Sequence, residues 1–186
     1  MRLFVSVDLP DALVPVVEAV QDHLRDASGL DVTDPTQAHV TLTFLGETDP
    51  DRLDEVENAL ARAVTEAGVD SFDATIEGIG AFPSTEYIRV VWLGIGRGTE
   101  ELTRLHESIE DRTTDLGFDP ADHEFTPHVT IARMNHAGGK DLVQRVLREH
   151  DPDVGSMRVE EVRLTESDLG PAGPEYSTVA QFPLGE

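Results

Sequence analysis

Hydrophobic and polar positions along the chain follow two periods, and their order predicts strands and helices. Residues 2–8 form an apolar run typical of a buried strand, and residues 10–29 carry apolar side chains at helical spacing. Residues 38–45 return to alternation, and a second helical pattern covers residues 50–68, between a proline and a glycine. The first third of the chain is therefore predicted to be strand, helix, strand and helix.

A similar order recurs after a central pair of strands. The patterns predict further strands at 72–79, 87–95, 127–133, 159–165 and 176–182, helices at 99–116 and 139–150, and a loop at 168–174. No low-complexity linker separates the halves. We predict an α+β fold in one continuous domain, residues 1–186. It is bilobal, with two pseudo-twofold-related lobes, each an antiparallel sheet packed on helices, and an active site in the groove between them.

One short motif is written twice inside predicted strands. "HVTLTF" begins at His39 and "HVTIAR" begins at His128. Successive side chains of a strand point to opposite faces, so the His and Thr of each copy share one face. In the first copy this places His39, Thr41 and Thr43 on one face and Val40, Leu42 and Phe44 on the other. Across a groove between two lobes, two imidazoles and two hydroxyls would converge.

These residue types suit chemistry on a phosphodiester. An imidazole titrates near pH ~6.5, so a neutral ring can accept a proton while a charged partner donates one. Each threonine hydroxyl can donate a hydrogen bond to one of the two nonbridging oxygens of a phosphodiester. None of the four residues is a good nucleophile for a covalent step, which favours direct attack by water or by an internal hydroxyl.

Composition limits the setting and the partners. The chain has 37 acidic and 14 basic residues, a formal net charge of −23 and no cysteine. The acids are spread between periodic apolar positions, which indicates a folded protein adapted to a salty cytoplasm more than a disordered acidic chain or RNA mimic. Disulfides and thiolate sites are excluded. The apolar N-terminal run, interrupted by Asp8, is too short for a signal peptide or a membrane span, so we expect a cytoplasmic protein with no membrane partner.

The duplicated motif and its flanks resemble the 2H phosphoesterase superfamily. Within it, the chain is similar to RNA 2′,3′-cyclic phosphodiesterases, also called 2′-5′ RNA ligases, through "RLFVSVDLP", "HVTLTFLGE", "FTPHVTIAR" and "SDLGPAGPEYS". The resemblance implies metal-free hydrolysis of a terminal 2′,3′-cyclic phosphate to a 2′-phosphomonoester. It also implies His39 as proton donor and His128 as proton acceptor, with Thr41 and Thr130 on the phosphoryl oxygens. Reverse 2′-5′ ligation would use the same groups.

Other residues are weaker candidates. Arg133 could balance phosphate charge, although simple alternation points it to the opposite face unless a bulge intervenes. Phe4 could stack on a base or pack in the core. The histidines outside the motifs, and Thr43, are read as structural. We expect no cofactor and no metal, because the spacing of His123, His128 and the nearby acids matches no known ligand pattern.

Two alternatives remain open. One is a phosphodiesterase for another small cyclic or 2′-5′-linked nucleotide, and the other is a non-catalytic module that binds RNA ends or nucleotides. Two intact His–Thr pairs disfavour pure binding, which needs no proton donor and acceptor together. The strong negative charge disfavours long RNA, so the expected partners are RNA ends or short oligonucleotides with a 2′,3′-cyclic phosphate, bound by a monomer.

Overall fold

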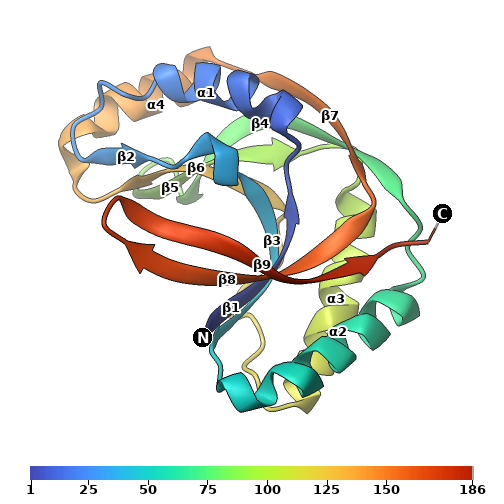
Figure 1. The fold of residues 1–186 in the computed structure, drawn as a ribbon. Helices are drawn as coiled ribbons and strands as arrows, with labels where there is room; N and C mark the ends of the chain where they lie inside the picture. Colours follow the sequence, from blue (N-terminus) through green and yellow to red (C-terminus); the bar gives the residue numbers. More distant parts are fainter. Residues whose placement is uncertain (186) are drawn as a thin grey trace.

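The computed structural model describes residues 1–185 as an α+β structure built on one curled antiparallel sheet (Figure 1). The strands are β1 (Arg2–Asp8), β2 (Leu30–Val32), β3 (His39–Glu47), β4 (Phe72–Pro83), β5 (Ile88–Ile95), β6 (His128–Met134), β7 (Asp153–Val159), β8 (Glu161–Gly170) and β9 (Gly173–Pro183). The helices are α1 (Val14–Asp22), α2 (Leu53–Ala67), α3 (Thr99–Asp115) and α4 (Lys140–Glu149). The predicted α+β class and antiparallel pairing are confirmed, but the strands form one continuous sheet where a separate sheet was predicted for each lobe.

The two motif strands lie next to each other in the middle of the sheet. The strand order is β7-β4-β5-β6-β3-β1-β8-β9, with β2 paired to the other part of β6. β3 and β6 are antiparallel and pair at Val40 and Val129, the residues between His and Thr in the two motifs. The sheet thus divides into one half around β3 and another around β6, and the motifs meet at the join.

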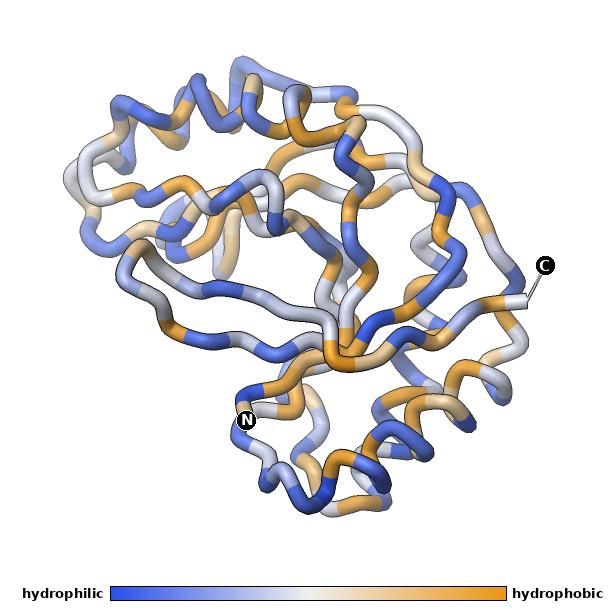
Figure 2. The backbone as a smooth tube through the Cα atoms, viewed as in Figure 1, coloured by the Kyte–Doolittle hydropathy of each residue, from blue (hydrophilic) through white to orange (hydrophobic). Residues whose placement is uncertain are grey.

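The helices cross over between these halves. α1 precedes β3 in sequence but packs on β6, whereas α3 precedes β6 and packs on β3 (Figure 1). α2 packs on α3 and β9, and α4 lies beside α1. β1 is buried from Leu3 to Val7, as its continuous apolar run predicts for a strand covered on both faces. Figure 2 shows hydrophobic and hydrophilic residues alternating along the helices, with hydrophilic residues on their outer sides.

Long-range strand pairing changes the predicted pattern at three places. The predicted loop at 168–174 is largely strand, because β8 and β9 stay in register to the pair Gly170–Gly173. β7 was not predicted. β4 was predicted to end at residue 79 but continues through Gly80 to Pro83. Glycine and proline mark turns in isolation, but a partner strand can override that local preference.

The first helix is shorter than its hydrophobic period predicts. α1 ends at Asp22, and the chain continues in tight turns in which Leu24 and Ala27 stay buried. Gly29, at φ 78°, then directs the chain into β2, which was not predicted. The apolar spacing therefore predicts correctly that Leu24 and Ala27 face the core. It does not predict that the helix ends before them, at Asp22. Within residues 1–185, no helix is both long and apolar enough to cross a membrane.

Candidate active site

The site is built around the junction of β3 and β6. Val40 and Val129 are fully buried and directly opposite each other, so the residues flanking them project from the other face of the sheet. His39, Thr41, His128 and Thr130 are all half-buried there. The structure therefore brings together the four residues that the motif predicts, and each histidine faces the threonine of the other strand across the junction.

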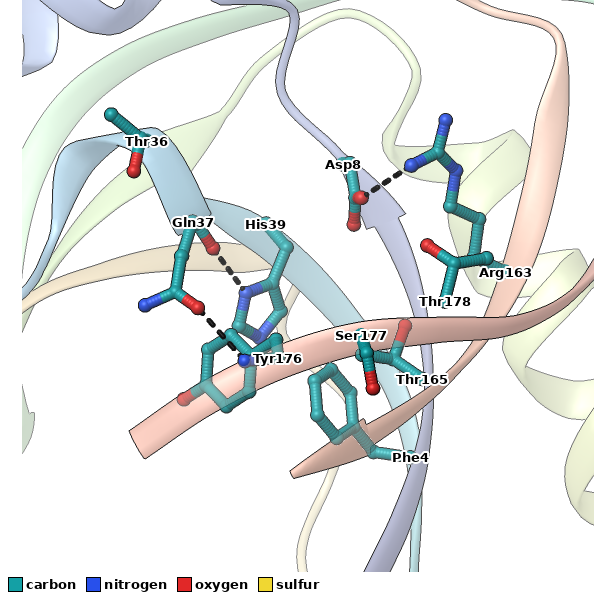
Figure 3. A pocket seen from close by; sticks show the side chains of 10 residues that line it. All are labelled: Phe4, Asp8, Thr36, Gln37, His39, Arg163, Thr165, Tyr176, Ser177 and Thr178. Carbon is teal, nitrogen blue, oxygen red and sulfur yellow. Dashed lines mark hydrogen bonds and ion pairs between the residues drawn. The ribbon is translucent and has the colours of Figure 1, made fainter. Parts of the chain in front are cut away.

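Both imidazoles are held in the same way. The Nδ1 of His39 bonds the backbone carbonyl of Gln37 at 2.9 Å, and the Nδ1 of His128 bonds the carbonyl of Thr126 at 2.7 Å (Figure 3 shows the first bond). A carbonyl oxygen only accepts, so Nδ1 carries the hydrogen in each ring. The Nε2 atoms are then the ones that exchange protons: a neutral ring accepts there, and a charged ring donates there.

Burial lowers the pKa of both histidines below the ordinary value. For His39, the carbonyl bond to Gln37 and the negative charge of Asp8 oppose this effect, and the positive charge of Arg133 adds to it. For His128, the carbonyl bond opposes burial, while positive charge at three neighbours lowers the pKa further. These neighbours are His123, His39 and Arg133. The charge of His39 thus acts on His128, as expected for two ionisable groups at one site.

A bulge in β6 places Arg133 at the site. Thr130 pairs with Trp92 and Ala132 pairs with Val91, so Ile131 is an extra residue between these pairs. Ile131 and Ala132 are both buried, and the alternation resumes with Arg133 exposed on the same face as His128. Simple alternation therefore gives the wrong face for Arg133. The stated exception, a bulge between His128 and Arg133, is present.

β3 has the same bulge and corrects a second prediction. Thr41 pairs with Ser6 and Thr43 pairs with Val5, which leaves Leu42 as the extra residue. Thr43 is therefore buried in the core and not on the face of Thr41, and Phe44 is 70% exposed on the face that carries His39. Phe44 thus occupies in β3 the position that Arg133 occupies in β6.

A cavity of about 200 Å³ opens beside His39 (Figure 3). Phe4 and Tyr176 form two of its walls, with ring centroids 5.0 Å and 5.2 Å from that of His39. Asp8 and Arg163, joined by a 3.0 Å ion pair, lie at its other side. Phe4 is only 4% exposed, so it both packs in the core and faces the cavity.

A second aromatic wall stands on the other side of the site. The rings of Phe82 and His128 lie edge to face at 4.9 Å, and Trp92 packs against both rings. Sequence reasoning missed Phe82, Asp8 and Gln37 as neighbours of the histidines. Gln37 lies two residues before His39, but Phe82 and Asp8 reach the site through strand pairing that local sequence does not show.

None of the histidines outside the motifs belongs to β3 or β6. His23 and His150 stack on each other at 4.2 Å at the ends of α1 and α4, and His123 bonds Asp122 in an exposed loop. His106 is buried beneath β3. Over residues 1–185, no three side chains of the His, Cys, Asp or Glu type come together as a metal-binding group.

The fold and the two His–Thr pairs agree with the resemblance to the 2H phosphoesterase superfamily that the sequence motifs indicate. The chain belongs to the 2′-5′ RNA ligase superfamily, whose family model matches residues 9–171. The chain is 36% identical over 186 residues to an RNA 2′,3′-cyclic phosphodiesterase of Methanothermobacter thermautotrophicus, with 99% of each chain covered. It is 35% identical over 184 residues to the protein of that name from Archaeoglobus fulgidus, with 98% of this chain and 99% of that one covered.

Solved structures show the same fold. The protein TT0787 of Thermus thermophilus superposes with a TM-score of 0.83 at 29% identity, with all of both chains covered. Escherichia coli LigT, solved with 3′-AMP, gives a TM-score of 0.80 at 24% identity, with 100% of this chain and 98% of that chain covered. The resemblance read from the motifs is thereby confirmed at the level of family and fold.

Proposed function

We propose that this chain hydrolyses 2′,3′-cyclic phosphodiester ends of RNA to 2′-phosphomonoesters by proton transfer between His39, His128 and the substrate. The observation that carries the proposal is the pair of Nδ1–carbonyl bonds, which leaves one Nε2 in each ring to exchange protons over a shared face. The names of the full-length relatives in Methanothermobacter and Archaeoglobus support this reaction and this substrate.

In the proposed step, the Nε2 of His128 takes a proton from water as the water oxygen forms a bond to phosphorus. The bond from phosphorus to the 3′ oxygen breaks, and the Nε2 of protonated His39 gives its proton to that oxygen. The hydroxyls of Thr41 and Thr130 donate hydrogen bonds to the two nonbridging oxygens, and Arg133 offsets the charge that develops on them. Proton exchange with solvent restores both rings. No metal ion is required by this sequence of transfers.

The surrounding charges support this division of roles. Asp8 raises the pKa of His39 against the effect of burial, which favours the proton donor there. Arg133 and His123 add to the lowering of the pKa of His128, which favours a neutral base. A bound phosphodiester anion would raise the pKa of both rings, so the donor becomes charged when substrate is present.

The substrate side of the proposal is a single RNA terminus. Arg133 supplies local positive charge near both histidines in a chain of net charge −23, which suits one phosphate group better than a long backbone. Arg163 is already paired with Asp8 and Glu161. Phe4 and Tyr176 offer aromatic surface to a neighbouring base. The same groups would join a 5′-hydroxyl end to a cyclic phosphate in the reverse direction, and hydrolysis would dominate in water.

The test is end-group analysis of a short oligoribonucleotide with a 2′,3′-cyclic phosphate, incubated with the protein in excess EDTA. We expect a 2′-phosphomonoester and unchanged turnover with and without the chelator. A parallel assay with free 2′,3′-cyclic and 2′-5′-linked nucleotides separates an RNA-end enzyme from one for small nucleotides. Binding of the oligonucleotide without turnover would favour the non-catalytic alternative, and loss of turnover in EDTA would contradict the metal-free step.

A further inference from the structure

A buried helix side chain binds the backbone at the bulge of each motif strand. In β3, the Nδ1 of His106, from α3, bonds the carbonyl of Leu42 at 2.6 Å. In β6, the Nε2 of Gln21, from α1, donates to the carbonyl of Ile131 at 3.0 Å. Leu42 and Ile131 are the extra residues of the two bulges, so the contacts are equivalent in the two halves. His106 is 7% exposed and Gln21 is fully buried.

Each of these side chains also contacts the segment that leads to the other motif histidine. The ring of His106 stacks on Phe125 at 4.2 Å with an interplanar angle of 7°, and Phe125 lies in the loop before His128. The Nε2 of Gln21 donates a second bond, of 2.8 Å, to the carbonyl of Thr33, on the segment before His39. Each helix therefore ties one motif strand to the approach of the other.

We propose that His106 and Gln21 are positioning residues that fix the two motif histidines relative to each other. Neither contacts the substrate-facing side of the sheet; each acts through a carbonyl on the core side. An apolar residue would fill a core position at lower cost, because a buried imidazole or amide must be hydrogen-bonded to be tolerated. The bulge in turn fixes the register of each motif strand on its neighbour, β1 or β5, and with it the position of the His–Thr pair that precedes the bulge. The proposal rests on the proposed function, because it needs a reaction that depends on this geometry.

The experiment compares two substitutions of His106 in the full chain. His106→Phe keeps an aromatic ring for stacking on Phe125 and removes the donor to Leu42. His106→Asn keeps a donor near the place of Nδ1 and removes the ring. We expect His106→Phe to lower kcat by about 10- to 100-fold with KM within about twofold, since small misplacement costs transition-state alignment more than binding. His106→Asn should recover most of that loss.

Gln21→Leu tests the equivalent contact from the other half and should lower kcat in the same way. The matched controls are His23→Phe, a helix histidine outside the junction, and Gln144→Leu, which removes a 2.7 Å amide–carbonyl bond from α4 to Thr85. Both controls should keep the wild-type kcat. Folded His106→Phe and Gln21→Leu proteins with wild-type kcat, or no recovery by His106→Asn, would overturn the proposal. If His106→Phe does not fold, Gln21→Leu decides by the same criterion.

A readout without turnover keeps this proposal separate from the proposed function. If the wild-type protein shows no cyclic phosphodiesterase activity, the proposed function fails. The imidazole resonances of His39 and His128 still report positioning, because the pKa of each ring depends on its burial and on its bond to a backbone carbonyl, and the pKa of His128 depends also on the charge of His39. In His106→Phe, or in Gln21→Leu if that variant is needed, a changed titration of either ring supports positioning. Unchanged titration of both rings contradicts it.

Discussion

Val40 of β3 pairs with Val129 of β6, and this buried pair lies between the two His–Thr pairs of the site. An antiparallel pair has a local twofold axis through its centre, so the axis here relates His39 to His128. A phosphodiester has nearly the same symmetry about phosphorus, with two nonbridging oxygens and two ester oxygens. The duplication of the motif thus matches the shape of the proposed reacting group, and the charged neighbours of the two rings break the symmetry.

Replacement of either motif histidine by asparagine should abolish proton transfer without loosening the strand. In His39→Asn or His128→Asn, the introduced amide nitrogen can take over the Nδ1 bond to the carbonyl of Gln37 or Thr126, but no atom replaces Nε2. We expect turnover to fall by about 10²- to 10⁴-fold, the usual effect of losing a positioned acid or base. Single-turnover assays measure this effect, and circular dichroism checks the fold. His150→Asn, at the C-terminal end of α4, is the control. Full turnover in His39→Asn would show that the reaction does not pass through that ring.

Thr41→Val and Thr130→Val remove one hydroxyl each and keep the shape of the side chain. If these hydroxyls bind the phosphoryl oxygens, each substitution should cost a few kcal/mol of transition-state stabilisation, about 10²-fold or more in kcat. Thr43→Val is the matched control in the same strand. The Oγ1 of Thr43 is buried without a hydrogen-bond partner in residues 1–185, so its loss should leave kcat unchanged and the free energy of unfolding unchanged or higher. Equal rates in all three variants would assign the motif threonines to strand structure.

The sequence contains the motif, and the faces of its first three residues follow from strand geometry alone. The orientation of Phe44 and Arg133 does not, because each depends on a bulge set by the partner strand, β1 or β5. Tyr176 reaches His39 only because β9 pairs with β8 and β8 with β1. His106 carried no local signal, since a histidine on a helix face looks the same whether it meets solvent or a buried carbonyl. The local hydrophobic period predicts on which face of a strand or helix a residue lies. Strand order and bulges depend on pairing across the whole sheet, so the period does not predict them.

Asp8→Asn should move the pH dependence of the reaction in one direction. The charge of Asp8 raises the pKa of His39, so its removal should lower that pKa further. Because the proposed donor must be protonated, the alkaline limb of the kcat/KM profile should shift to lower pH. Asp54→Asn, an exposed carboxylate in α2, should leave the profile in place. A shift to higher pH in Asp8→Asn would reverse the assigned roles.

Arg133→Met should weaken substrate binding and shift the pH profile of kcat/KM to higher pH. Loss of a charge-assisted contact to the phosphate should raise KM about tenfold or more. Arg133 also lowers the pKa of both histidines, so its removal should raise the pKa of His128. The proposed base must be neutral, so the acidic limb of the kcat/KM profile should shift to higher pH. The pKa of the donor His39 should rise too, so the alkaline limb should move in the same direction. Steady-state kinetics across pH measure both effects, with Arg148→Met on α4 as the control. An unchanged KM would remove Arg133 from the substrate site.

Salt should stabilise the fold. At a net charge of −23, repulsion among acidic side chains opposes the compact state, and screening shortens its range from about 10 Å in 0.1 M salt to about 3 Å at 1 M. We expect the Tm to rise by at least about 5 °C between 0.1 M and 1 M KCl, which corresponds to roughly 2 kcal/mol for a chain of this size. Glu107→Gln with Asp111→Asn, two exposed acids of α3, should raise the Tm at low salt and reduce its salt dependence. A Tm that is independent of KCl, or an unchanged salt dependence in the double variant, would mean that self-repulsion does not limit stability and that the acidic surface has another cause.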